Sequence, residues 1–334
     1  MGKVPTIQAR AAEKILRAAS GHGVTAQSLF QATGLSPEIL SHPDNRIPFA
    51  QLVLLYETAA ALTGDHDFGL HVGENVDPKA FDVMGYSAIN SPTLGAALDR
   101  VARYNFIWTD GSAVTLETES EVARIFYTYL DPSLTECRQD TEMTFAAIVA
   151  LGRLVTDAEW SPRSVSFQHN RPRDVTEHER IFRLTPAFNA PANEFVFDAA
   201  TLSLPLTKAD PGLGAVLDRH AEELIARYPR ADTLVNQVRM IIKHELNGGD
   251  ASLDRVAGQL SMSGRSLQRK LREHATSHQE LLDQLRKDLA MRYLREPEMA
   301  ICEVAYLLGF SESSALHRAF KRWTGMTPSE FRGR

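Results

Sequence analysis

Polar side chains of two short segments near the carboxyl end recur at helical spacing, opposite a leucine-bearing face. Their types are those that hydrogen-bond to the edges of DNA bases. Arginine bonds guanine through two nitrogens, glutamine bonds adenine through its amide, and serine bonds either base. The outward-facing residues are Arg265, Gln268, Arg269 and Arg272 in the first segment, and Ser313, Ser314, His317 and Lys321 in the second, with Arg318 near the edge of that face.

A second set of polar side chains in these segments is better placed for phosphate. Phosphate contacts fix the position of a protein on the duplex and carry no sequence information themselves. The residues predicted to contact phosphate are Ser263, Lys270, Ser311, Lys321 and Arg322.

An internal repeat relates the two segments. Residues 253–260 return 48 positions later as residues 301–308, and Val256-Ala257 matches Val304-Ala305. Each copy predicts a short helix, a tight turn and a second short helix, which is the helix-turn-helix pattern. A single copy is equally well explained by an ordinary solvated helix face. Two copies that match in small, apolar and basic positions favour DNA binding.

The predicted turn and helix faces agree with this pattern. Gly309 lies where the turn of the second copy needs a left-handed backbone conformation, which glycine adopts at little cost. Leu267 and Leu271 face inward in the first copy, as Leu316 and Phe320 do in the second. The polar side chains therefore lie on the outer face of each second helix.

The elements that must position these side chains form an all-α domain over residues 234–334. Its two helix-turn-helix units cover about residues 252–274 and 300–323. A helix over residues 277–295 connects them and would be about 27 Å long at 1.5 Å per residue. Two reading helices held by such a strut would reach successive major grooves, which lie roughly 34 Å apart.

The preceding 227 residues predict an α+β domain. Apolar residues recur at helical spacing over 7–19, 26–33, 48–62, 93–108 and 134–155. Alternating patterns over 113–119 and 122–130 predict a β-hairpin, and 164–168 and 194–198 predict further strands. Interleaved helices and strands of this kind indicate a mixed domain. Residues 228–233 break the pattern and are the expected linker.

Composition is that of a globular protein with an uneven charge distribution. The chain has 334 residues and a net charge of −6. Residues 233–334 hold 16 Lys and Arg against 12 Asp and Glu, whereas the rest hold 20 against 30. A basic part that meets phosphate and an acidic part are thus joined in one chain.

No apolar run is long enough for a membrane span, and two cysteines 165 positions apart predict neither a disulfide framework nor a metal site. We expect a cytoplasmic location.

The motifs of common enzymes are absent from the sequence. It lacks the GxxxxGK phosphate loop, the GxGxxG fingerprint and the GxSxG nucleophile turn. His244-Glu245 has no second histidine four residues after the first, so it is not a zinc protease motif. An enzyme with an attached DNA module remains the first alternative, but no catalytic residue, cofactor or metal is expected.

The chain resembles the AraC/XylS family of bacterial regulators. The resemblance covers about residues 234–332 and rests above all on the ending from Val304-Ala-Tyr-Leu-Leu-Gly-Phe-Ser to Thr327-Pro-Ser-Glu-Phe-Arg332. It implies base contacts from Arg265, Gln268, Arg269, Ser313, Ser314, His317 and Arg318. The sequence departs from the family at Leu316, where phenylalanine is frequent, and the fold expectation is unchanged.

The sequence over about residues 8–207 resembles the arabinose-binding-type domain of the ornithine-utilisation-regulator branch. Gly21-His-Gly-Val24, Arg46-Ile-Pro48 and Phe81-Asp-Val-Met-Gly-Tyr86 carry this weaker resemblance. It implies a small-molecule effector, a homodimer and contact with RNA polymerase, alongside double-stranded DNA as the main partner. It does not make arabinose the effector. Control by protein partners without any effector is the second alternative.

Effector-binding residues are not assigned by the sequence. Tyr86, Tyr104, Trp108 and His169 are of types that line ligand pockets. Core packing or a simple hydrogen bond is the more frequent role of such residues.

Overall fold

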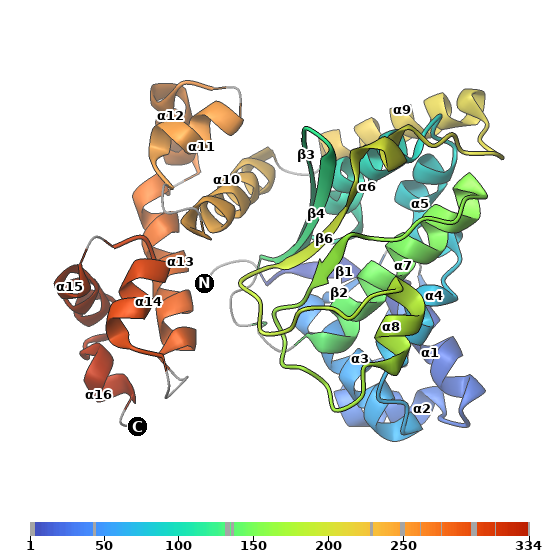
Figure 1. Cartoon of the computed structure of the whole chain (residues 1–334), viewed down its shortest axis with the longest axis horizontal. Helices are drawn as coiled ribbons and strands as arrows, with labels where there is room; N and C mark the ends of the chain where they lie inside the picture. The colour runs from blue at the N-terminus through green and yellow to red at the C-terminus, as the bar shows by residue number, and fades with distance from the viewer. Residues whose placement is uncertain are drawn as a thin grey trace. The chain divides into compact units, whose positions relative to one another are not determined.

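The computed structural model describes residues 4–42, 45–130, 134, 137–227, 230–247, 251–260, 262–274, 276–294, 299–310 and 312–332. Its chain divides into two compact units, Met1–Arg227 and Tyr228–Arg334. Unit 1 contains helices and sheets, and unit 2 is helical in its described residues (Figure 1). This is the fold class that the sequence predicts.

Unit 1 has two antiparallel sheets. The first pairs two three-residue strands, and the second has the strand order β3-β4-β6-β5. The strands are β1 (Thr6–Gln8), β2 (Arg46–Pro48), β3 (Ser112–Glu119), β4 (Val122–Tyr129), β5 (Ser164–Ser166) and β6 (Asn193–Asp198). The predicted hairpin is confirmed as β3 and β4. The prediction of a helix from residue 7 is wrong, because Ile7 lies in β1 opposite Ile47.

The helices of unit 1 precede, separate and follow the strands of the larger sheet along the chain. They are α1 (Ala11–Gly21), α2 (Ala26–Thr33), α3 (Phe49–Thr63), α4 (Phe68–Glu74), α5 (Asp82–Ile89), α6 (Leu94–Trp108), α7 (Arg138–Thr156), α8 (Thr176–Phe182) and α9 (Pro211–Arg227). Short 3-10 helices are η1 (Pro37–Ser41), η2 (Pro78–Phe81) and η3 (Ala199–Ser203).

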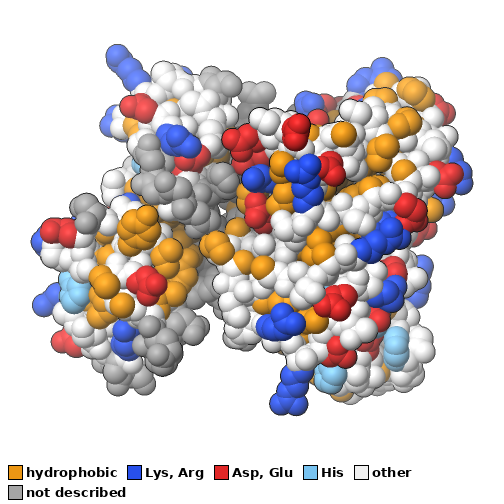
Figure 2. Space-filling view, in the orientation of Figure 1, with side chains coloured by type: hydrophobic (Ala, Val, Ile, Leu, Met, Phe, Trp, Pro, Cys, Tyr) orange, Lys and Arg blue, Asp and Glu red, His pale blue; other side chains and the backbone are white. Residues whose placement is uncertain are grey.

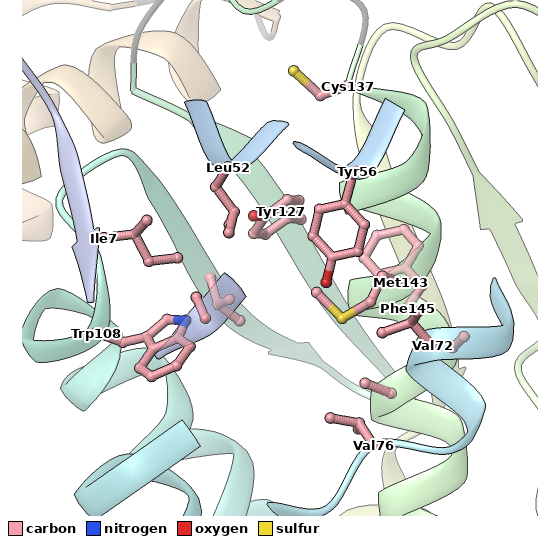
Figure 3. Close-up of a cluster of buried hydrophobic side chains, with 14 of the residues drawn as sticks. Ile7, Leu52, Tyr56, Val72, Val76, Trp108, Tyr127, Cys137, Met143 and Phe145 are labelled. Carbon is pink, nitrogen blue, oxygen red and sulfur yellow. The ribbon is translucent and has the colours of Figure 1, made fainter. Parts of the chain in front are cut away.

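Helix α7 packs on the buried face of the sheet. Side chains of β4 alternate in burial, as one buried and one solvated face require. Phe145 of α7 meets Phe195 of β6 with ring centroids 5.7 Å apart, and the Tyr127 hydroxyl donates to Asp140 of α7 at 2.7 Å. The sheet and α7 thus share one core, part of which Figure 3 shows.

Two glycines bring α4 against α7. A Cβ atom at Gly69 would collide with the carbonyl oxygen of Gln139, and one at Gly73 with that of Met143. Glycine at both positions therefore permits backbone contact between the helices. This contact fixes α4 against the part of α7 that carries the buried residues Asp140 and Met143.

Unit 2 has two hydrophobic clusters joined by one helix. Its helices are α10 (Arg230–Asn247), α11 (Leu253–Gln259), α12 (Gly264–Glu273), α13 (His278–Tyr293), α14 (Ile301–Leu307), α15 (Ser313–Thr324) and α16 (Pro328–Arg332). Leu281, Leu282 and Leu285 of α13 belong to the cluster around α11 and α12. Ala290 of α13 and Leu294, the residue that follows this helix, belong to the cluster around α14 and α15.

The expected linker overlaps a helix. Tyr228 and Pro229 lie outside the described residues, and α10 begins at Arg230. The helix expected from residue 234 thus begins four positions earlier, because Arg and Ala are good helix formers.

Candidate nucleic-acid interface

The first helix-turn-helix unit consists of α11 and α12. Ser263 caps α12, its hydroxyl accepting from the Ser266 amide at 3.2 Å. Leu267 and Leu271 are fully buried, so the helix is fixed on one side. Arg265, Gln268, Arg269 and Arg272 are exposed, and Lys270 is half-buried. The inward and outward faces are those that the sequence predicts.

The second unit consists of α14 and α15. Gly309 has φ of 67°, the left-handed conformation expected of the turn. Leu316 and Phe320 are fully buried. The exposed residues are Ser314, Arg318, Lys321 and Arg322, and the half-buried ones are Ser313 and His317. Ser311 lies outside the described residues. Figure 2 shows basic side chains and a histidine along α15.

Three of the predicted DNA-contacting arginines form surface ion pairs. Arg269 pairs with Glu273 at 3.1 Å, and Arg318 with Glu312 at 3.5 Å. Arg322 pairs with Asp283 of α13 at 2.9 Å. Exposed pairs of this kind contribute little stability, about 0 to 1 kcal/mol, so each arginine is available to another partner.

Glu312 sets the charge at the start of α15. A hydrogen bond from Ser314 and the nearby Arg318 lower the pKa of this carboxyl. Its negative charge holds Arg318 over the first turn of the helix, where Ser314 also accepts from Arg318 at 3.3 Å.

Arg286 of α13 holds the turn of the second unit, a role that sequence patterns do not reveal. Its Nε donates to the Leu308 carbonyl oxygen at 2.9 Å, and its Nη2 to that of Gly309 at 3.1 Å. The guanidinium also lies 4.5 Å from the centre of the Phe310 ring. Three contacts from one side chain thus fix the turn against α13.

Glu245 performs a similar task in the first unit. This buried carboxylate of α10 accepts hydrogen bonds from Arg255 and Gln259 of α11. The two bonds tie the first helix of the unit to α10. The only sequence signal for either role is a charged residue on an otherwise ordinary amphipathic helix.

Helix α13 therefore fixes the position of α12 relative to α15. It has 16 residues, or about 24 Å at 1.5 Å per residue. It contributes to both hydrophobic clusters and carries Arg286. The arrangement presents two polar helix faces from one rigid frame.

Unit 1 contains a partly open apolar cavity of about 140 Å³. Trp108, one of the four residues considered for an effector pocket, lies on its wall. Tyr104 instead donates to Asp218 at 3.2 Å, and Tyr86 is partly exposed. His169 is buried, with its Nε2 atom 3.4 Å from the carboxylate of Glu142. The sequence missed Lys14, which reaches the same cavity from α1.

A buried polar network lies apart from this cavity. Asp67, Glu142 and His178 bring possible ligand atoms within 4.8 Å of one another. Arg138 donates to Asp67 at 2.6 Å and to Glu142 at 2.8 Å, and His178 contacts Glu142 at 2.6 Å. The guanidinium already supplies the positive charge between the carboxylates, which fits an ion-pair network better than a metal centre.

Two family models match the chain. The arabinose-binding domain of AraC transcription regulators matches residues 23–206, and a helix-turn-helix domain matches residues 256–334. The second match contains α12 and α15. In the part of the chain that the structure describes, none of the helices has the length and apolar composition needed to cross a bilayer.

Similar proteins carry names of regulators. The ornithine utilization regulator of Pseudomonas aeruginosa is 29% identical over 96% of this chain and 94% of its own length. The HTH-type transcriptional regulator VirS of Mycobacterium tuberculosis is 28% identical over 89% of this chain and 88% of its own. The crystal structure of the regulator CdpR from P. aeruginosa aligns with a TM-score of 0.46 at 21% identity, over 97% of this chain and 98% of that one.

Proposed function

The chain belongs to the AraC family of DNA-binding transcription regulators, and from this premise we propose that α12 and α15 read two adjacent major grooves of one promoter site. A small molecule bound by unit 1 controls this binding. Base contacts come from Arg265, Gln268, Arg269, Ser313, Ser314, His317 and Arg318. Phosphate contacts come from Ser263, Lys270, Ser311, Lys321 and Arg322.

The observation that carries the proposal is the shared helix between two exposed polar faces. Leu285 and Ala290, five residues apart on α13, belong to different hydrophobic clusters. One rigid element thus supports both reading helices. One chain with two DNA-contacting helices can thus reach two major grooves, which dimeric regulators do with one helix from each of two chains.

The cavity of unit 1 supports control by an effector. Binding sites for small molecules are concave and mostly apolar, with a few polar groups that orient the ligand. The cavity has this character, and the matched domain is of a ligand-binding type by its name.

Selection of bound sequences from a random DNA pool, followed by footprinting, tests the two-groove proposal. We expect two protected base clusters on one side of the duplex, about one helical turn apart. A single cluster, or no protection, would contradict the proposal.

Dimer formation, contact with RNA polymerase and control by protein partners need separate tests. Analytical ultracentrifugation would test the homodimer, and transcription in vitro would test contact with RNA polymerase. A regulator controlled by partners alone would show no shift in melting temperature with any small molecule.

A further inference from the structure

The cavity of unit 1 has apolar walls and one polar end. Residues from α3, α5, α6 and α7 line it, among them Leu52, Met84, Leu98 and Trp108. Figure 3 shows Trp108 and Ile7 on one side of this core and Met143 on the other, with the Tyr56 hydroxyl pointing toward Met143. Lys14 and Asp140 bring charge to the same space.

Two hydrogen-bond donors beside Met143, which lines the cavity, lack a strong acceptor (Figure 3). The Lys14 ammonium donates to the Met143 thioether at 3.6 Å and lies 4.7 Å from the centre of the Phe81 ring. Neither is a strong acceptor of hydrogen bonds. The Tyr56 hydroxyl is buried without any hydrogen-bond partner in the described residues. Buried polar groups normally have partners, and the half-buried ammonium of Lys14 has only weak ones, so an acceptor is missing beside Met143.

The neighbouring carboxylate does not supply that acceptor. Asp140 accepts from the hydroxyls of Tyr127 at 2.7 Å and Tyr129 at 3.0 Å. Among the described residues, no carboxylate forms an ion pair with Lys14. Burial lowers the pKa of Lys14 to about 8, and the charge of Asp140 acts in the opposite direction. Lys14 therefore carries a positive charge at neutral pH.

Size and charge restrict the ligand. A dry cavity of roughly 150 Å³ holds benzene, so a cavity of about 140 Å³ takes a body of similar size. An amine would place a second positive charge beside Lys14, and Asp140 is already bonded by two hydroxyls. An acid would supply the strong acceptor that the ammonium of Lys14 lacks.

We propose that unit 1 binds a small monocarboxylic acid, with its carboxylate at Lys14 and its apolar body in the cavity. This assignment rests on the proposed function, since it names the chemical class of the effector. Charge-assisted hydrogen bonds are the strong ones, and the Lys14 contact is of that kind.

A route for the ligand passes Lys14. This residue also lines a second hollow of about 630 Å³, which Arg10, His71 and Ala80 border. Residues of η2 contribute to both spaces, Pro78 and Phe81 to the cavity and Lys79 to the hollow. Lys14 thus lies between the hollow and the cavity, where a ligand arriving from the hollow would enter.

Calorimetric titration of the full chain at pH 7 tests the assignment with probes of equal chain length. Sodium hexanoate should bind about tenfold or more tightly than 1-hexanol, and hexylamine should bind least. Benzoate should bind in the same manner as hexanoate. The assignment is overturned if hexanoate and benzoate show no saturable binding, or if hexanoate binds no better than hexanol.

Two variants at Lys14 test whether the carboxylate of the bound acid contacts this residue. Lys14→Met keeps the length of the side chain and removes a buried charge, so we expect it to fold, as circular dichroism would check. It should lose about tenfold or more in hexanoate affinity while hexanol binding changes little. Lys14→Arg keeps the charge and should retain the preference for the acid. Unchanged hexanoate affinity in Lys14→Met would overturn the assignment.

A mobility shift on the selected DNA separates this inference from the proposed function. If hexanoate binds but leaves DNA binding unchanged, the acid site stands and effector control fails. If hexanoate does not bind while the protein protects its site, the acid site fails and the DNA-reading proposal stands.

Discussion

In the proposed function, Arg269 and Lys321 make two different kinds of contact with DNA. Both are exposed and basic, and each lies on the second helix of its unit. A guanidinium reads guanine through two bonds, whereas an ammonium acts as a point charge on phosphate. The two residues should therefore respond differently when the DNA sequence changes.

Replacement of Arg269 by alanine should cost about 1 to 3 kcal/mol of binding free energy at the selected site. On random DNA the loss should be much smaller. Lys321→Ala should weaken binding to both DNAs alike and lower the slope of log affinity against log salt by about one unit. Fluorescence anisotropy over a salt series measures both. Equal losses on the two DNAs for Arg269→Ala would remove its base-reading role.

His169 makes the stability of unit 1 depend on pH. Burial lowers the pKa of this imidazole, although the Glu142 carboxylate raises it. The unfolded chain, with a histidine pKa of about 6.5, then binds more protons than the folded chain just below that pH. Stability is accordingly lost as the pH falls from about 6.5 toward the folded pKa.

Urea unfolding at pH 7.5 and pH 5.5 checks this effect. The midpoint should fall more between these pH values in the parent protein than in His169→Gln. His22→Gln, at an exposed histidine of unit 1, should behave like the parent. If the urea midpoint of His169→Gln fell between these pH values as much as that of the parent protein, other groups would be the cause of the pH dependence.

Some residue roles are beyond sequence patterns. The outward faces of α12 and α15 are predictable because Leu267, Leu271 and Leu316 define the opposite side. Lys14 and Arg286 lie on helices where a charged residue ordinarily faces water. Their partners, Met143 and the turn at Leu308, come from distant parts of the chain, so local periodicity contains no signal for them.

At the scale of elements, the amphipathic helices, the hairpin and the short strands β5 and β6 are predictable from local patterns, whereas α4 and β1 are not. Helix α4 contains Gly69 and Gly73, which locally weaken a helix. Their close contact with α7 explains both residues and the helix. Strand β1 has three residues and pairs with β2 about forty positions later, a non-local contact that no short window of sequence reveals.

Arg286→Met tests how α13 orients the second unit. The variant loses two hydrogen bonds to carbonyl groups and the contact with Phe310, at a cost of about 1 to 3 kcal/mol in unfolding free energy. Protection of the base cluster under α15 should weaken more than that under α12. Lys287→Met, the next position on α13, is the matched control. Equal weakening of both clusters would contradict an orienting role for Arg286.

At the scale of the whole molecule, each unit has hydrophobic clusters of its own. The cluster of unit 1 extends from Ile7 to Ala221, and those of unit 2 begin at Leu234. Separate cores permit separate folding. The acidic part and the basic part of the sequence correspond to these units.

A fragment that begins at residue 228 should fold and bind the selected DNA without unit 1. Circular dichroism should show a helical spectrum with a cooperative thermal transition, and footprinting should show both base clusters. The fragment should not bind hexanoate. A fragment that is unfolded in isolation would show that unit 2 depends on unit 1 for stability.

The shared core helix has a consequence for promoter architecture. A strut whose ends are both embedded in packed clusters can neither stretch nor swivel, since packed interiors resist deformation. One extra base pair moves the second recognition element by about 3.4 Å along the axis and rotates it about the duplex. Natural operators for this protein should therefore tolerate base changes between their two halves but no insertion or deletion there.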